Sequence, residues 1–160
     1  MAARLLTALL LTAAAARAEK VWVFEAGQSF VSVEAGRVSA FSSALGGSVR
    51  ESDSGLLTAT LHIPLASFVG EHGLPAIASP EVTFEGSVTP DQKHLHGKLT
   101  VNGVTKDVVA PITLVRGNGM LFGHATFTLH LADYGLPLPD ARVDVDAGLR
   151  PERAPLASRG

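Results

Sequence analysis

Regular alternation of apolar and polar residues is the feature of this sequence that most restricts its fold. Between residues 57 and 65 every second residue is apolar, and Thr58, Thr60 and His62 stand between them. Similar alternation of apolar or small residues with polar ones recurs in residues 82–88, 95–101, 125–131 and 143–149. Because successive side chains of a β-strand point to opposite faces, each segment predicts a strand with one apolar and one solvated face. After Glu19 no segment has the i, i+3, i+4, i+7 spacing of a full-length helix.

Turn-forming residues separate these segments. Asn102-Gly103 and Gly117-Asn118-Gly119 supply residues that accept positive φ, as β-hairpins require. The pattern predicts eight or nine strands, near residues 21–26, 29–36, 46–52, 56–66, 81–88, 93–102, 107–116, 121–132 and 141–150. Many short strands in one small domain indicate a sandwich or a barrel, and closure into a barrel removes the exposed sheet edges. We therefore expect an all-β fold, a single antiparallel up-and-down β-barrel.

The two ends of the chain differ from this pattern. Residues 1–18 combine an early Arg4, an apolar run and the small-residue site Ala16-Arg17-Ala18, which is typical of a secretory signal peptide. The apolar run is about a dozen residues, whereas a membrane span needs ~20, so a retained anchor is the weaker alternative. We expect cleavage after Ala18, a barrel domain over residues 19–150, and a disordered tail over residues 151–160. After cleavage we expect 160 − 18 = 142 residues with no stable membrane span.

Composition excludes several classes of protein. The absence of cysteine excludes a disulfide framework, a thiolate metal site and a cysteine nucleophile. The sequence has 13 Lys and Arg against 15 Asp and Glu, and loss of Arg4 and Arg17 with the signal gives 11 − 15 = −4. Nucleic-acid binding requires clustered basic charge, so we expect no nucleic-acid partner. An exported domain without disulfides depends on its core, and the bacterial periplasm suits it better than a eukaryotic secretory route.

Six histidines are the most obvious candidates for metal binding or catalysis. His94 and His96 lie on the same face of one predicted strand, a spacing that metals use. That face also carries Lys98 and Thr100, and the strands with His124 and His130 contain no carboxylate. We therefore favour histidines on the solvated outer wall over a metal site. A metal-dependent enzyme using His94 and His96 would need a third ligand nearby in space.

No other group of residues predicts catalysis. The sequence lacks the G-x-S-x-G and H-E-x-x-H motifs and a glycine-rich phosphate loop before a helix. Asp144 and Asp146 share a strand face, but Arg142 beside them favours a solvated charged surface. We therefore expect neither an enzyme nor a cofactor.

The inward face of the predicted barrel is apolar, and its only aromatic residues are Trp22, Phe24, Phe84 and Phe127. A closed barrel of eight strands holds packed side chains or one small ligand. Small inward residues would leave room for a ligand, namely Ala59, Gly86, Gly97 and Ala125. A completely packed interior is the alternative, and it is the usual state of small barrels.

One segment resembles a known family. Residues 96–108 read His-Gly-Lys-Leu-Thr-Val-Asn-Gly-Val-Thr-Lys-Asp-Val and resemble the YceI-like family, with matches at Gly97, Leu99, Thr100, Val101, Gly103, Val104, Thr105 and Lys106. Asp133-Tyr134-Gly135 is similar to a turn of that family, and the match extends over nearly all of the chain after residue 18. The resemblance implies a lipocalin-like barrel, exported by bacteria, that binds a polyisoprenoid or another long amphiphilic lipid.

The sequence departs from the family pattern at two places. The family carries a longer helical insert with an Arg-Asp-x-His-Leu core, where this chain has the short segment Phe68 to Ser79. The family's Arg ahead of the Asp-aromatic-Gly turn is replaced by Leu131.

Alternation and family position together predict the residues that line an apolar cavity. Two functions follow: a periplasmic carrier that binds an isoprenoid or similar lipid without covalent attachment, or a packed structural or interaction module without a ligand. A cavity of about 300 Å³ or more would indicate the carrier, and a filled interior would indicate the module. The sequence also leaves open a homodimer, in which a second copy of the chain is the partner. The predicted ligand-binding residues are Trp22, Phe24, Val31, Val33, Phe84, Leu99, Val101, Phe127 and Leu129.

Overall fold

A computed structural model describes residues 19–70 and 80–153 and contains ten antiparallel strands in one sheet. Two short 3-10 helices accompany the strands: η1 (Leu65–Ser67) and η2 (Leu131–Tyr134). Among the described residues, no helix has the length and apolar character needed to cross a membrane. The strands are β1 (Lys20–Phe24), β2 (Phe30–Ala35), β3 (Val38–Ser42), β4 (Gly46–Glu51), β5 (Leu57–Pro64), β6 (Glu81–Val88), β7 (His94–Val101), β8 (Val104–Gly117), β9 (Met120–Leu129) and β10 (Ala141–Pro151).

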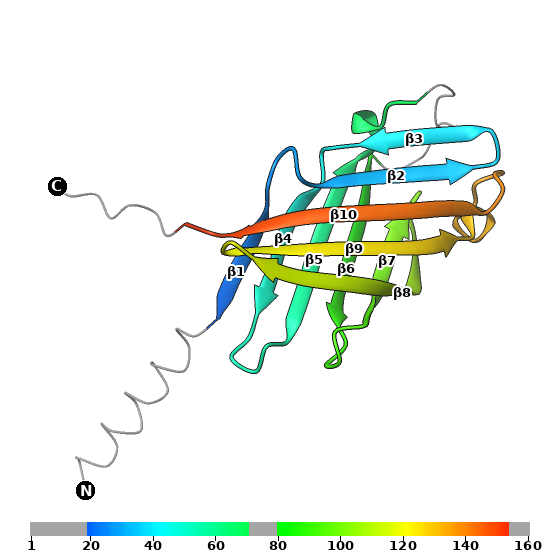
Figure 1. Cartoon of the computed structure of the whole chain (residues 1–160). Coiled ribbons are helices and arrows are strands. Elements are labelled where there is room, and N and C mark those ends of the chain that lie inside the picture. Colours follow the sequence, from blue (N-terminus) through cyan, green and yellow to red (C-terminus); the bar gives the residue numbers. More distant parts are fainter. Residues whose placement is uncertain (1–18, 71–79, 154–160) are drawn as a thin grey trace, which may run out of the picture.

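Eight of these strands close a barrel. β4 to β10 are successive antiparallel neighbours, and β1 pairs with both β4 and β10, which completes the ring (Figure 1). The expected all-β fold, a single antiparallel lipocalin-like barrel, is confirmed. The β2–β3 hairpin adds two strands beyond this ring and interrupts the up-and-down order between β1 and β4, so β3 ends the sheet as an edge strand.

β1 and β2 lie one after the other along the same side of β10. β1 pairs with Leu149–Pro151 and β2 pairs with Arg142–Asp146. Between them the chain leaves the ladder, and the hydroxyl of Ser29 accepts a hydrogen bond from Gly148 N and donates one to Gly148 O. β10 therefore belongs to two parts of the wall: one continues into β1 and β4, the other into β2 and β3.

The sequence pattern did not predict β3. The strand has only five residues, and its inward positions are Val38, Ala40 and Ser42, of which Ser42 is buried although it is polar. A buried serine breaks the apolar alternation that identifies the other strands. The preceding turn contains Gly36 at φ 60°, a backbone conformation that glycine adopts without steric cost.

The barrel is tightly packed at the end where β1 closes it. Leu121 pairs with Leu149, which pairs with Phe24 on its other side, and Leu121 is 1% exposed. Trp22 and Leu57 are each 2% exposed in the same apolar core.

The two chain ends and the segment between β5 and β6 lie partly outside the described residues. The predicted signal peptide, residues 1–18, lies wholly outside them, as do residues 71–79 and 154–160. At the start of the expected tail, Pro151 pairs with Trp22, and the N–H of Glu152 donates to Val21 O at 2.9 Å. The last strand therefore runs beyond the boundary expected at residue 150.

Candidate functional site: an apolar cavity in the barrel

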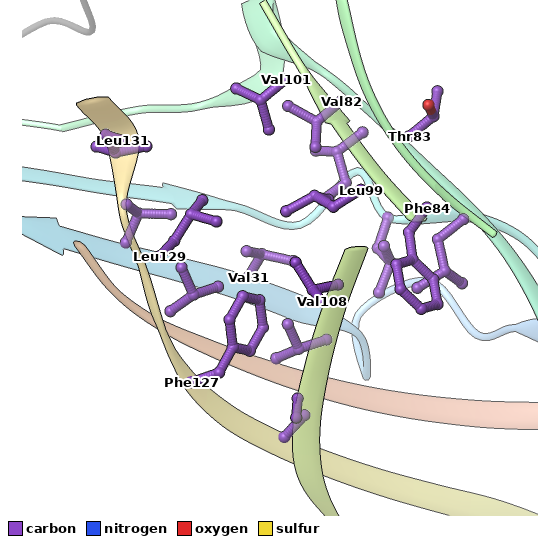
Figure 2. Close-up of a pocket in the computed structure, with 18 of the residues that line it drawn as sticks. Val31, Val82, Thr83, Phe84, Leu99, Val101, Val108, Phe127, Leu129 and Leu131 are labelled. Atoms are coloured by element: carbon purple, nitrogen blue, oxygen red, sulfur yellow. The ribbon is translucent and has the colours of Figure 1, made fainter. Parts of the chain in front are cut away.

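The barrel encloses a cavity of about 170 Å³ (Figure 2). β2 and strands β5 to β10 contribute to its wall, and side chains such as Phe84 and Phe127 point into it. Among the described residues that line it, Thr83 is the only polar one, and none is ionisable. Apart from Thr83, this wall offers a ligand no hydrogen-bonding or charged side chain, so binding there depends on the burial of apolar surface, worth about 25 cal/mol per Å².

Seven of the nine predicted ligand-binding residues line this cavity. Trp22 and Phe24 do not, although both are inward and buried or half-buried as expected. Both belong to β1, which pairs with β10 at Leu149–Pro151, whereas the cavity reaches β10 at Val143 and Val145. They therefore lie at the packed end of the barrel. Contact of any of the nine with a ligand stays a prediction; the seven are Val31, Val33, Phe84, Leu99, Val101, Phe127 and Leu129.

Trp22 has polar partners of its own at that end. Its indole N–H donates to Glu51 Oε1 at 3.1 Å, and the Lys20 ammonium lies 4.5 Å from the ring centroid. Arg116 also faces the ring and binds Glu51 at 3.0 Å. These contacts fix the ring in the wall, so the tryptophan closes the barrel there.

Several lining residues come from segments outside the strands, and strand alternation could not identify them. Leu65 and Phe68 come from η1 and the residue after it, Leu131 from η2, and Leu136 and Leu138 from the loop that follows. Leu131, which replaces the family's arginine, is 6% exposed and thus adds apolar surface. The signal available in the sequence was the pair of leucines around Pro137, apolar residues without a strand to place them.

The space expected beside Gly86 is already occupied. A Cβ atom at Gly86 would lie 2.5 Å from Cζ of Phe84 and 2.3 Å from the His96 carbonyl oxygen. At Gly97 it would lie 2.2 Å from the Glu85 carbonyl oxygen. These glycines allow the β6 and β7 backbones and the Phe84 ring to approach closely, so they create no room for a ligand.

The loop after β9 is held by polar contacts outside the cavity. Asn102 Nδ2 donates to Tyr134 O at 2.9 Å, which connects η2 to the β7–β8 turn. His130 Nδ1 lies 3.0 Å from Asp140 Oδ2, and this hydrogen bond raises the pKa of the exposed histidine above 6.5. Burial raises the pKa of the Tyr134 phenol, with a smaller contribution from Asp133.

The other histidines that the structure describes lie on the outer wall. His62, His94, His96 and His124 are all exposed, as the alternation predicts. In residues 19–70 and 80–153, no group of three or more His, Asp or Glu side chains is close enough to hold a metal ion.

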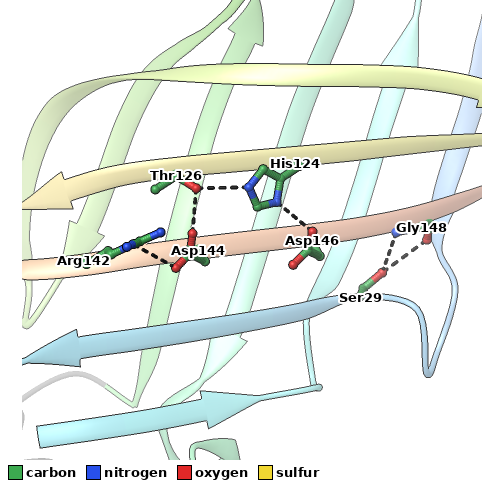
Figure 3. A network of polar contacts seen from close by, with 7 residues as sticks. All are labelled: Ser29, His124, Thr126, Arg142, Asp144, Asp146 and Gly148. Carbon is green, nitrogen blue, oxygen red and sulfur yellow. Dashed lines mark hydrogen bonds and ion pairs between the residues drawn. The ribbon is translucent and has the colours of Figure 1, made fainter.

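A polar network runs along β9 and β10 on this outer surface (Figure 3). His124 Nδ1 lies 2.7 Å from Asp146 Oδ1, and Thr126 donates to Asp144 at 2.6 Å. Asp144 also pairs with Arg142 at 3.3 Å. The sequence places no carboxylate in the strand of His124, but the neighbouring strand supplies one. Both partners of the His124–Asp146 pair are about half exposed, so this is a solvated surface contact.

Comparison with known proteins identifies the family. The sequence profile of the YceI-like domain matches residues 22–150. The BcnA protein of Burkholderia cenocepacia has a similar structure, with a TM-score of 0.64 and 15% identity over 79% of this chain and 98% of that one. A polyisoprenoid binding domain from Saccharophagus degradans, implicated in plant cell wall breakdown, has a TM-score of 0.60 and 14% identity over 82% of this chain and 98% of that one. A search of curated protein sequences finds no match. The domain match covers most of the chain, which therefore belongs to the YceI-like family.

Proposed function

We propose that this protein is an exported carrier that holds an isoprenoid or another long amphiphilic lipid, without covalent attachment, in the cavity of its barrel. The observation that carries the proposal is the chemistry of the cavity wall, where Thr83 is the only polar lining residue in the described part of the chain. A hydrocarbon tail fits such a wall, whereas a polar ligand would lose its hydrogen bonds to water without replacement. The polyisoprenoid binding domain of similar fold supports the same class of ligand.

The wall also argues against a reaction at this site. Proton transfer, nucleophilic attack and metal binding all need a titratable or coordinating group near the ligand. The described lining residues include no titratable group, so the hydroxyl of Thr83 has no base among them to activate it. Binding without chemical conversion is therefore the function we propose for the cavity.

The small size of the cavity is also consistent with a second function, that of a packed module. Its volume of about 170 Å³ is below the value of about 300 Å³ that we expected for a carrier. An apolar cavity of about 150 Å³ accommodates one benzene molecule. A packed structural or interaction module with a residual cavity is therefore the alternative. If the protein is a carrier, its cavity must widen to hold a long tail.

Export is the second part of the proposal. Residues 1–18 have the sequence of a signal peptide, and we propose that cleavage after Ala18 delivers the mature domain to the periplasm. Expression of the full chain in a Gram-negative host, followed by fractionation and intact-mass measurement, tests this. A periplasmic protein that begins at Glu19 supports export, and an uncleaved cytoplasmic chain contradicts it.

Native mass spectrometry tests the carrier function. The mature protein, purified from the periplasm under mild conditions, should retain a lipid adduct that organic extraction releases for identification. Isoprenoid quinones added to the emptied protein should raise its melting temperature, because a ligand that binds only the folded state stabilises it. Absence of both an adduct and a melting shift would support the packed module.

A further inference from the structure

In the part of the barrel wall that the structure describes, backbone pairing is sparse at one place. The β4–β5 ladder ends at the pair Gly46–His62, and beyond it the chain that follows β5 faces β3 instead of β4. In the part of the chain that the structure describes, the backbone of β3 pairs with this segment at one bridge, between Phe41 and Val69. Each N–H of that pair donates to the other's carbonyl oxygen at 2.8 Å. We name this region the β3–η1 seam; it consists of Phe41, Ser42, Ser67 and Val69.

The joints between successive strands from β4 to β10 are longer. The β9–β10 register, for example, runs without interruption from Ala141 to Leu149. In Figure 1, β3 forms the free edge of the sheet, and the short helical turn after β5 lies beside its arrowhead. Because local opening breaks sparsely bonded parts of a structure first, the seam should open more easily than these joints.

The seam lies directly outside the cavity. Leu65 and Phe68 line the cavity from the η1 side, and Val33 and Leu45 line it from the side of the β2–β3 hairpin and the segment after it. Both side chains of the bridge are already exposed, Phe41 by 42% and Val69 by 66%, so opening would expose little further apolar surface on them. Separation of the two sides would therefore widen the cavity at small cost in buried apolar surface.

A hydroxyl pair holds the inner side of the seam. The Oγ atoms of Ser42 and Ser67 lie 2.6 Å apart, and Ser42 is 1% exposed. Each hydroxyl has a second partner on its own side: Ser67 donates to Pro64 O at 2.5 Å, and Ser42 accepts from Ala44 N at 3.1 Å. When the seam opens, each serine keeps one hydrogen bond, and water can replace the contact between the two. This arrangement suits a joint that opens and closes repeatedly.

We propose that the β3–η1 seam is the gate of the cavity, and that it opens to admit the hydrocarbon tail of the ligand. This inference rests on the proposed carrier function, because a cavity of about 170 Å³ is too small for a long tail and must widen to hold one. The gate therefore both provides the entrance and enlarges the cavity.

Hydrogen exchange of the unmodified protein tests the gate without any ligand. The amides of Phe41 and Val69 should exchange by local opening, at least about a hundredfold faster than the protected amides of the β9–β10 ladder. Exchange of both seam amides only through global unfolding, at the rate of that ladder, would overturn the proposal.

A reversible cross-link tests the gate with a ligand. The chain has no cysteine, so the double variant Ser42→Cys/Ser67→Cys forms one defined disulfide across the seam, where the two oxygen atoms are already within disulfide reach. Uptake of diphenylhexatriene, a hydrocarbon whose fluorescence rises in apolar surroundings, is followed by stopped flow. Oxidation should slow uptake at least about tenfold, and reduction should restore the rate. The variant Thr100→Cys/Thr105→Cys, built on a 2.8 Å pair of exposed hydroxyls in the β7–β8 hairpin, is the matched control and should show no change.

The outcomes separate the two proposals. Equal uptake by the oxidised and reduced seam variant overturns the gate and leaves the carrier function intact. If the reduced variant and the unmodified protein both fail to bind the probe and isoprenoid quinones, the carrier function fails. Hydrogen exchange then decides alone whether the seam opens.

Discussion

The hydroxyl of Ser29 forms two hydrogen bonds with the backbone of Gly148, accepting from its N–H at 3.1 Å and donating to its carbonyl at 3.2 Å (Figure 3). Ser29 is 2% exposed and lies between β1 and β2, where the ladder with β10 is interrupted. A side chain thus replaces the backbone partner at the point where β10 passes from one part of the wall to the other. The carbonyl of Gly148 also accepts a hydrogen bond from Glu25 N at 2.7 Å. The Ser29 hydroxyl is therefore more important for the buried N–H of Gly148 than for its carbonyl.

Ser29→Ala should therefore destabilise the barrel. The substitution removes the acceptor of the Gly148 N–H, and a buried polar group without its partner costs about 1–3 kcal/mol. Urea unfolding followed by tryptophan fluorescence measures the change. Ser39→Ala, at an exposed position of β3, is the control and should change the free energy of unfolding by less than about 0.5 kcal/mol. Equal stability of the two variants would show that the Ser29 hydroxyl has no such role.

Gly86→Ala should also destabilise the fold, because its Cβ would collide with the Phe84 ring and with a backbone oxygen of β7. Overpacking of this kind costs about 1–3 kcal/mol. Gly117→Ala is the matched control, since a Cβ there meets no atom within 4 Å and the backbone needs no positive φ. Guanidinium unfolding of both variants gives the comparison. A Gly86→Ala protein as stable as the control would contradict the close packing of Phe84 on β6.

Filling the cavity should weaken ligand binding. Ala125 on β9 lines the cavity and is 7% exposed, so Ala125→Leu places three more carbon atoms in a space of about 170 Å³. We expect at least about a tenfold loss of affinity for diphenylhexatriene in a fluorescence titration, since a tenfold change corresponds to only about 1.4 kcal/mol. Val109→Leu enlarges a residue that is 66% exposed on the outer wall, and its affinity should equal that of the unmodified protein. Unchanged affinity of a folded Ala125→Leu protein would mean that the ligand binds elsewhere.

The His130–Asp140 pair should make the stability of the η2 region depend on pH. The hydrogen bond to Asp140 raises the pKa of His130 above 6.5 in the folded state, and Asp133 adds a smaller effect in the same direction. Protonated histidine therefore favours the folded state fully below the unfolded pKa of about 6.5, and this contribution is lost as pH rises through the higher folded value. The NMR titration of His130 should move down toward pH 6.5 in Asp140→Asn. An identical titration in both proteins would contradict the pairing.

Alternation predicts which side of the wall the residues of five strands face, and the structure agrees for the described outer-wall histidines and for the buried faces of β5, β6, β7, β9 and β10. Alternation does not give the position of a residue along the barrel axis. For this reason Trp22 and Phe24 were grouped with Phe84 and Phe127, although β1 closes the packed end. Axial position depends on strand register, and register is set by pairings between segments far apart in the sequence.

Strand alternation could not predict the parts of the cavity wall that come from loops. Leu131, Leu136 and Leu138 belong to a 3-10 helix and a loop, which have no side-chain period of two. The volume of the cavity was equally inaccessible, because it depends on the direction of the Phe84 ring, which fills the space above Gly86. The resemblance of residues 96–108 to the YceI-like family suggests the class of ligand that we propose, which geometry alone does not give.

NMR spectroscopy of the methyl groups shows whether an apolar ligand lies inside the barrel. Protein with labelled Leu and Val methyl groups is titrated with an isoprenoid quinone, and intermolecular NOEs locate its tail. A tail inside the barrel should give NOEs to Leu99, Leu129 and Val143, which line the cavity. It should give none to Val109 and Val115 on the outer surface, which are 66% and 56% exposed. NOEs confined to these outer valines, or no NOEs at a saturating concentration of the quinone, would contradict binding in the cavity.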